Sequence, residues 1–315
     1  MLCDLGLEEE KKIENRFGLV FLQKIKHFLI PLSLKWELSD LQLVNSFSSN
    51  LVFKGHSKKF GRIVLKFSNN TEEFISEVTA LDYFQGNSVC RVFDMDTDNL
   101  VLLEECICPG EILALEKDLN KRLDVFCDLY QSIHMKKDID IQKSGKITSL
   151  AGYKSYQDWV FQIEAYMVQQ DAWQEVAIHM SRAKVRYIEM AQNHAANQLL
   201  HGDFHYYNIL KGEYGYKIID PKGVIGNRIF DVPRYVLNEI WDLEDEGMIN
   251  QKIDQIFDVL SWKLSISKDI LSMALYIEGV MAVSWCVEDG AGLHEKENYL
   301  NKLENLERFI QKYSE

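Results

Sequence analysis

The chain has 315 residues and a mass of 36.7 kDa, and 47% of its residues are hydrophobic. This is enough for two modest lobes with their own cores, and it excludes a disordered chain or a repeat array. The formal net charge of −13 argues against nucleic acid as a partner, because phosphate backbones are bound by clustered Lys and Arg. The acidic N-terminus predicts no signal peptide and the six cysteines show no zinc spacing, so we expect a cytoplasmic protein.

The N-terminal third is expected to form a small sheet with one helix. A helix beginning at Thr71 as its N-cap is expected to run to residue 81, because apolar residues recur there at helical spacing. Apolar, partly β-branched runs predict strands at residues 41–44, 51–54, 62–68 and 99–106.

A polar linker with Pro109 and Gly110 follows the last of these strands. Since Pro and Gly are scarce elsewhere, the only plausible boundary is a hinge near Glu105. We therefore expect an N-terminal lobe of residues 1–105 and a helical C-terminal lobe of residues 106–315.

The C-terminal lobe is expected to be built on long helices, at residues 116–137 and about 156–198. Residues 270–287 are almost wholly apolar and could be mistaken for a membrane span. Because inserting the carboxylate of Glu278 would cost about 2.5 kcal/mol or more, a buried helix and no membrane partner are expected. A carboxylate in a core helix needs a partner or a cleft, so Glu278 is a candidate site residue.

The candidate catalytic and metal-binding residues lie in two neighbouring segments of the sequence. His201, Asp203 and Asn208 lie in a loop framed by apolar residues, and Asp220 ends a strand-like run. Kinase catalytic loops have histidine, aspartate and asparagine in this order, where the aspartate accepts a hydroxyl proton and the asparagine holds Mg²⁺. We expect Asp203 to be the base, Asn208 and Asp220 the Mg²⁺ ligands, and His201 to hold the loop. Either motif alone would be weak evidence for catalysis, because His-x-Asp occurs often by chance and Asp-Pro-x-Gly is usually only a turn.

A kinase site also needs a cation for the nucleotide phosphates, and Lys66 near a strand end is the candidate. Glu77 on the following helix is its expected partner, although Glu73 serves equally well if the helix is rotated. The alternative is that Glu77 is a solvated charge on an amphipathic helix.

The predicted nucleotide-covering loop at residues 45–50 contains no glycine, so the backbone cannot approach phosphate as closely as a glycine-rich loop does. Backbone amides and the hydroxyls of Ser48 and Ser49 would have to bind the phosphates, or the loop lies further away. Adenine would be bound by backbone groups around Glu104 and Cys106.

Acidic residues crowd beside tryptophans late in the chain, and acidic walls with rigid aromatic rings suit a cationic acceptor. The alternative is that they form solvated faces. The candidate acceptor-binding residues are Trp241, Asp242, Glu278, Trp285 and Glu288.

The segment from His201 to Asn208, together with Asp220-Pro221-Lys222-Gly223 and Phe230-Asp231, resembles the aminoglycoside phosphotransferases. The Asp-Pro-Lys-Gly form, with Leu103 and Glu104 at the hinge, is most similar to the streptomycin 6-phosphotransferase and hydroxyurea kinase branch. The resemblance runs from about residue 36 to 238 and is specific at 200–238. It implies that Asp231 braces the catalytic loop through backbone hydrogen bonds. Asn227 departs from the acidic residue usual near that position.

The expectation is an α+β, bilobal protein-kinase-like fold with a small antiparallel sheet and a mainly helical second lobe. Its reaction would transfer the γ-phosphoryl group of ATP or GTP, with Mg²⁺, to a hydroxyl of a small polar, cationic acceptor such as streptomycin. The segment between Asp220 and Asp231 leaves no room for a peptide-docking activation segment. The alternatives are a kinase of a sugar, choline or an amino acid, and a nucleotide-binding pseudokinase.

Overall fold

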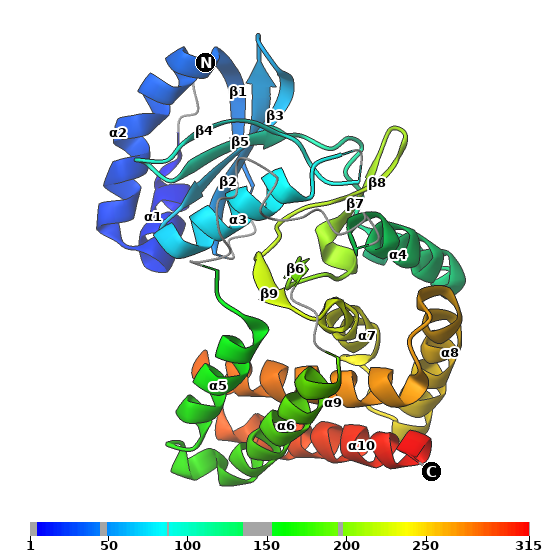
Figure 1. Ribbon diagram of the computed structural model, residues 1–315. Coiled ribbons are helices and arrows are strands. Elements are labelled where there is room, and N and C mark those ends of the chain that lie inside the picture. Colours follow the sequence, from blue (N-terminus) through cyan, green and yellow to red (C-terminus); the bar gives the residue numbers. More distant parts are fainter. Residues whose placement is uncertain (1–4, 45–48, 87, 135–152, 195–197, 315) are drawn as a thin grey trace. The chain divides into compact units, whose positions relative to one another are not determined.

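The computed structural model describes residues 5–44, 49–86, 88–134, 153–194 and 198–314 (Figure 1). The chain divides into two compact units, Met1–Glu111 with Leu210–Ile219, and Ile112–Ile209 with Asp220–Glu315. The first unit therefore takes in a short hairpin that follows the predicted catalytic loop in sequence. A small antiparallel sheet and a helical remainder make the fold α+β, as predicted from the sequence.

The first unit contains one five-stranded antiparallel sheet. Side chains alternate between the two faces of the sheet along β2, so Leu51 and Phe53 are fully buried while Lys54, the residue after Phe53, is exposed. In spatial order the strands are β1 (Leu38–Leu43), β2 (Asn50–Ser57), β3 (Gly61–Ser68), β5 (Val101–Glu105) and β4 (Val92–Asp96).

Two helices precede the sheet, α1 (Leu7–Phe17) and α2 (Leu19–Trp36), so the prediction of a single helix in the N-terminal third is wrong. Their buried side chains, among them Ile25 and Trp36, form one hydrophobic cluster with sheet residues such as Phe53. The helix pair therefore shares the core of the sheet.

The helix expected after β3 is α3 (Thr71–Tyr83). Its N-cap is Asn70 and not Thr71, because the Asn70 side chain accepts hydrogen bonds from the backbone N–H groups of Glu72 and Glu73. The hairpin of β7 (Ile209–Gly212) and β8 (Gly215–Ile218) joins this unit through backbone hydrogen bonds between Ile218 and residues 88 and 90.

The second unit is mainly helical. The pattern predicted over residues 156–198 is broken after Met167 by a turn of 3₁₀ helix at Asp171–Trp173, so it forms two helices. The helices are α4 (Leu119–His134), α5 (Tyr156–Met167), α6 (Gln174–Asn193), α7 (Pro233–Ile240), α8 (Glu246–Leu264), α9 (Lys268–Glu288) and α10 (Lys296–Ser314), and a two-stranded ribbon joins β6 (Gln198–Leu200) to β9 (Val224–Gly226). Further 3₁₀ turns lie at Leu113–Leu115, Tyr206–Asn208, Arg228–Asp231 and Leu293–Glu295.

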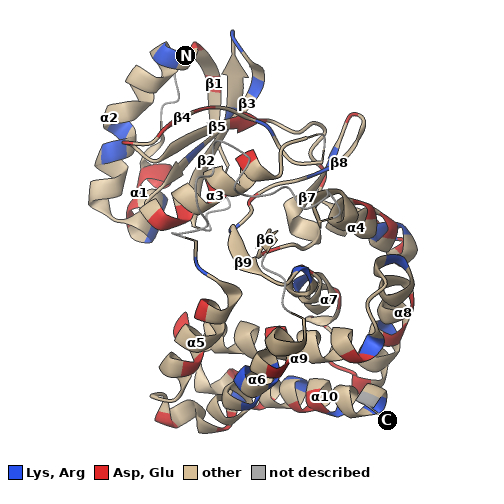
Figure 2. Cartoon of the chain, viewed as in Figure 1, with Lys and Arg blue, Asp and Glu red and all other residues tan. Residues whose placement is uncertain are grey.

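Helix α9 forms the centre of this unit, and α5, α6, α7, α8 and α10 pack against it. It carries few charges, whereas α10 beside it carries both signs (Figure 2). Among the described residues α9 is the one helix long and apolar enough to cross a membrane, and 72% of its apolar window is buried inside the protein. The apolar run at residues 270–287 is thus a core helix, as predicted.

Candidate active site

The predicted catalytic loop and the segment of Asp220 meet at one end of the β6–β9 ribbon. These strands pair antiparallel, with Leu200 opposite Val224. Beyond the ribbon, the backbone N–H of Lys222 donates to the carbonyl of His201 at 2.7 Å. The loop leaving β6 and the segment entering β9 are therefore held together by backbone hydrogen bonds.

Asp231 fixes the backbone of the catalytic loop. Its fully buried carboxylate accepts hydrogen bonds from the backbone N–H groups of His201 at 2.8 Å and Gly202 at 2.7 Å. The other contact is with His134 Nε2 at 2.9 Å. A carboxylate with several donors is a strong anchor, because charge-assisted hydrogen bonds are short and directional.

Gly202 is required by the shape of this loop. Its φ of +80° lies in the left-handed region that glycine favours. A Cβ at this position would approach side-chain atoms of Trp159 and Val224 to 3.0 Å. The glycine before Asp203 therefore combines a backbone and a packing constraint.

Asp203 lies at the centre of a polar cluster with a side chain that is 28% exposed. Its carboxylate lies 3.3 Å from His205 Nε2 and 3.8 Å from Arg234 Nε. Burial acts to raise the pKa of Asp203, but the hydrogen bond from His205 and the charges of His205, Arg234 and His201 outweigh it and hold the pKa well below its usual value. Asp203 is therefore a carboxylate at neutral pH, with an exposed part that a hydroxyl group can reach.

The amide of Asn208 is oriented by the same loop. Its Nδ2 donates to the backbone carbonyl of Asp203 at 3.0 Å, so Oδ1 is the amide atom left for a cation. Asp220 has φ of +57°, a left-handed conformation that is uncommon for a residue other than glycine and is found often at active sites. One carboxylate and one amide oxygen are hard donors of the kind that Mg²⁺ prefers, so these residues fit that ion.

Lys66 of the first unit is buried in an acidic surrounding. Its Nζ lies 2.5 Å from Glu77 Oε1 and 3.6 Å from Glu104 Oε2. Of the two glutamates considered from the sequence, Glu77 makes this contact, whereas Glu73 is exposed and accepts a hydrogen bond from Asn70. The Glu104 side chain, which had no assigned role, is a second carboxylate beside the lysine.

For the other residues predicted to bind nucleotide, the structure gives their place in the chain or in the sheet. Ser48 lies outside the described residues, and Ser49 lies immediately before β2. The backbone N–H of Cys106 donates to the carbonyl of Arg62 at 3.3 Å, so it continues the pairing of β3 with β5 by one residue. The Cys106 and Cys108 sulfur atoms lie 3.9 Å apart.

Two of the predicted acceptor-binding residues lie beside the catalytic loop. Arg234 Nη2 pairs with Glu278 Oε1 at 2.6 Å, and the guanidinium carbon lies 5.1 Å from the centre of the Trp285 ring. Tyr156 donates a hydrogen bond to the same carboxylate. Through Arg234, both Glu278 and Trp285 are connected to Asp203.

The remaining predicted acceptor residues have no direct contact with Asp203 among the described residues, although the charge of Asp242 acts on Tyr206 of the catalytic loop. Trp241 is covered by Lys302, whose Nζ lies 4.6 Å from the ring centre. Asp242 and Glu288 are exposed. Within the described part of the chain no hydrogen bond or ion pair connects Trp241, Asp242 or Glu288 to Asp203.

Arg234 was not identified from the sequence. Its one sequence signal is its position a single turn after Asp231, at the start of a helix that the sequence analysis did not predict. The burial of that helix, and with it the direction of the arginine, depends on contacts with residues distant in sequence.

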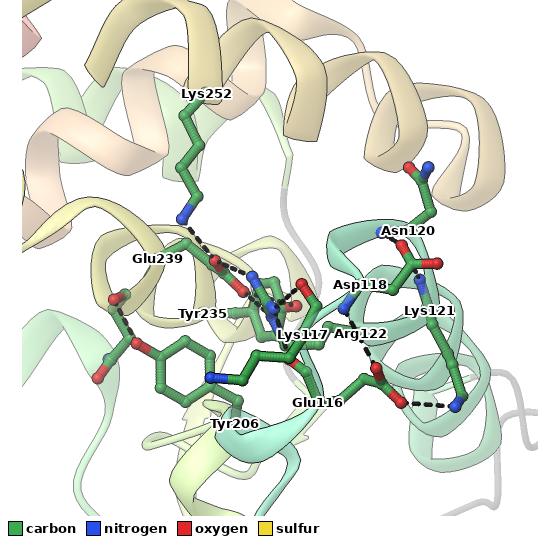
Figure 3. Close-up of polar contacts among 11 residues, drawn as sticks. Glu116, Lys117, Asp118, Asn120, Lys121, Arg122, Tyr206, Tyr235, Glu239 and Lys252 are labelled. Atoms are coloured by element: carbon green, nitrogen blue, oxygen red, sulfur yellow. Dashed lines mark hydrogen bonds and ion pairs between the residues drawn. The ribbon is translucent and has the colours of Figure 1, made fainter. Parts of the chain in front are cut away.

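A buried charge network fastens the helix that carries Arg234 (Figure 3). Arg122 of α4 binds both carboxylate oxygens of Glu239, at 2.6 and 2.7 Å, and Lys252 of α8 lies 2.9 Å from the same carboxylate. Tyr206 of the catalytic loop donates to the backbone carbonyl of Asn238 at 2.5 Å. Helix α7 is thereby tied to α4, α8 and the catalytic loop.

Comparison of the whole chain with solved structures shows the kinase-like fold. The chain resembles the choline kinase LicA from Streptococcus pneumoniae, with a TM-score of 0.64, 14% identity, and 92% of this chain and 100% of that chain covered. It also resembles a thermostable mutant of the aminoglycoside phosphotransferase APH(4)-Ia in complex with ADP and hygromycin B, with a TM-score of 0.61, 13% identity, and 90% and 97% covered. A choline/ethanolamine kinase family protein from Mesorhizobium loti gives a TM-score of 0.62 at 11% identity, with 92% and 97% covered.

No protein among the curated sequences matches the chain. The profile of the aminoglycoside/hydroxyurea antibiotic resistance kinases, by contrast, matches residues 35–290. This range includes Lys66, the catalytic loop and the cluster around Arg234, and it leaves α1 and most of α2 outside. The chain therefore belongs to the aminoglycoside/hydroxyurea antibiotic resistance kinase family and is a small-molecule phosphotransferase.

Proposed function

We propose that this enzyme transfers the γ-phosphoryl group of ATP or GTP to a hydroxyl group of a small polar acceptor. The observation that carries the proposal is Asp203, a partly exposed carboxylate with a lowered pKa in a loop braced by Asp231. In the reaction a bond forms between the acceptor oxygen and the γ-phosphorus while the bond from the γ-phosphorus to the bridging oxygen breaks. The nucleoside diphosphate leaves, and the hydroxyl proton passes to Asp203.

The lowered pKa makes Asp203 a weak base, which suits a role in orienting the hydroxyl and accepting its proton late. We assign Asn208 and Asp220 to Mg²⁺, which when bound would offset the charge of the phosphates. Lys66 would align the phosphates, with Glu77 holding its ammonium group in place. Ser48, Ser49 and the backbone near Glu104 and Cys106 remain proposed nucleotide contacts.

The acceptor that we propose is small and cationic, of the streptomycin type. The formal net charge of −13 would attract such a molecule. The description of the family also names aminoglycosides and hydroxyurea. Trp285 beside Arg234 is the aromatic surface that we assign to the acceptor, whereas Trp241, Asp242 and Glu288 would form a more distant wall.

A second candidate is a kinase of a choline-type alcohol. It is favoured by the fold likeness to LicA and to the choline/ethanolamine kinase family protein. Acceptor pockets differ within one fold, so the fold does not select between these substrates.

An acceptor panel separates the candidates. Purified enzyme with Mg²⁺ and either ATP or GTP is tested against streptomycin, hygromycin B, hydroxyurea, choline and ethanolamine by release of nucleoside diphosphate and by mass of the product. Turnover with streptomycin and not with choline supports the first proposal, and the reverse supports the second. Nucleotide binding without transfer to any acceptor or to water would favour a pseudokinase.

The role of Asp203 is tested by Asp203→Ala, which should lower kcat about 10²- to 10⁴-fold, the usual contribution of a positioned acid or base. The matched control is Asp258→Ala, because that side chain is 67% exposed on α8. Undiminished turnover of a folded Asp203→Ala enzyme would refute the assignment.

We also propose a cytoplasmic location. The five cysteines in the described part of the chain are free thiols, the state that the reducing cytoplasm maintains. A fusion with a periplasmic or cytoplasmic reporter, with activity measured in each compartment, tests it.

A further inference from the structure

Arg234 has a hydrogen-bond donor that the structure does not use. Its Nη2 is paired with Glu278, but its Nε is buried from solvent and has no hydrogen-bond partner among the described residues. Buried polar groups are nearly always paired, so each exception in a native protein calls for an explanation. In this case the unpaired donor lies beside the proposed base.

The direction of this donor is set by the surroundings of the guanidinium group. Glu278, whose side chain is 3% exposed, holds one end of the planar group, and Tyr156 donates to the same carboxylate. The Trp285 ring lies beside its carbon atom at 5.1 Å. Because a guanidinium group is rigid and planar, these contacts also determine where the Nε–H points.

The nearby acceptor is the carboxylate of Asp203. Nε lies 3.8 Å from Asp203 Oδ1, whereas an N–H···O hydrogen bond is about 2.7–3.2 Å long. Asp203 is instead contacted by His205 at 3.3 Å and by Asn208 Nδ2 at 3.4 Å. The Asn208 contact is with the other oxygen, Oδ2, whereas His205 and Arg234 both approach Oδ1. A small movement of Oδ1 toward Arg234 would therefore form a hydrogen bond with Nε at the expense of the contact with His205.

We propose that Arg234 is a positioning residue for Asp203. When nucleotide and Mg²⁺ bind, Arg234 Nε–H donates to Asp203 Oδ1, and this bond sets the orientation in which Asp203 receives the acceptor hydroxyl. Glu278 and Tyr156 act through Arg234, so Glu278 serves the catalytic loop and does not bind an acceptor ammonium group. The proposal rests on the proposed function of Asp203.

A purely structural role makes different predictions. If Arg234 only fastened α7 to α9 through Glu278, a lysine could keep that ion pair and the activity with it. Lysine has no Nε–H donor in a fixed plane, so Arg234→Lys removes the proposed bond while it keeps the charge. Arg182→Lys is the matched control, because Arg182 pairs with Glu307 at 3.0 Å on a side chain that is 54% exposed.

The direct test is NMR of arginine Nε–H groups in the intact enzyme, with the Arg234 signal assigned by its loss in Arg234→Lys. Adding Mg²⁺ and a saturating amount of AMP-PNP or GMP-PNP, whichever analogue the enzyme binds, should move this proton signal downfield in the wild type and leave it in place in Asp203→Ala. An unmoved signal in the wild type, or an equal movement in Asp203→Ala, overturns the proposal. This measurement needs no acceptor.

The kinetic test uses the acceptor phosphorylated in the panel. Arg234→Lys should lower kcat about 10²-fold, the cost of misplacing a catalytic group by about 1 Å, with the KM for ATP unchanged. Wild-type kcat in Arg234→Lys overturns the role of Arg234 while the function of Asp203 stands, provided that Asp203→Ala is inactive. Wild-type kcat in Asp203→Ala would instead remove the proposed function itself.

Discussion

Replacing Lys66 by methionine should destabilise the first unit of the protein. The Lys66, Glu77 and Glu104 side chains are 5%, 9% and 5% exposed, so the lysine supplies the positive charge beside two buried carboxylates. Lys66→Met keeps most of the side-chain volume and removes only the ammonium group. Both glutamates then stay buried without the positive charge of the ammonium group.

The expected loss is about 3 kcal/mol, since breaking a buried ion pair from one side costs about 3–5 kcal/mol. We use the lower figure because Glu77 and Glu104 make further interactions within the protein. At about 2–4 °C per kcal/mol, this predicts a fall in Tm of roughly 6–12 °C. The double variant with Glu77→Gln should recover part of it, because it removes one of the two buried charges.

The assay is thermal unfolding followed by circular dichroism at pH 7, without nucleotide. The control is Lys59→Met, because Lys59 pairs with Glu37 at 3.4 Å while both side chains are 46% exposed, and exposed pairs contribute about 0–1 kcal/mol. Equal melting of the Lys66→Met and Lys59→Met proteins would refute the conclusion that Lys66 neutralises buried carboxylates.

Three further predictions concern the catalytic loop and the helix that supports it. Burial acts to raise the pKa of Glu239, but the hydrogen bonds from Arg122 and Lys252 outweigh it and lower the pKa below 4.5. The stability that ionised Glu239 contributes is therefore complete above pH 4.5 and is lost as the pH falls through the folded-state pKa. The difference in Tm between wild type and Glu239→Gln should therefore be larger at pH 7 than at pH 3.5, and a constant difference would contradict it. Asp231→Ala leaves the His201 and Gly202 N–H groups without their carboxylate and should cost about 2–6 kcal/mol by denaturant titration, with Asp231→Asn losing less. Gly202→Ala should lower both kcat and Tm because of its φ of +80° and the 3.0 Å approaches, whereas Gly215→Ala, with φ of +138° but no atom within 4 Å, should lower Tm alone.

The sequence by itself indicated which residues of the second unit's loop are candidates for catalysis. His201, Asp203 and Asn208 lie within one short segment, so their spacing along the chain largely decides their spacing in space. The apolar residues predicted to frame the loop include those of β6, whereas the pairing of β6 with β9, which was not predicted, holds that loop to the segment of Asp220. The Lys66 and Glu77 pair was also predictable, because a strand and the helix that follows it are near neighbours.

Only the tertiary structure decided which distant residues lie beside these candidates. Glu278 and Trp285 were noticed in the sequence as a buried charge and an aromatic ring, but their contacts with Arg234 exist only because α7 packs on α9. Asp242 and Glu288 had equally suitable sequence surroundings, but both are exposed and no hydrogen bond or ion pair between described residues connects them to Asp203. A hydrophobic pattern shows that a helix has a buried face but not which helix covers it, so a contact between residues such as 203, 234 and 278 depends on packing geometry that no local pattern specifies.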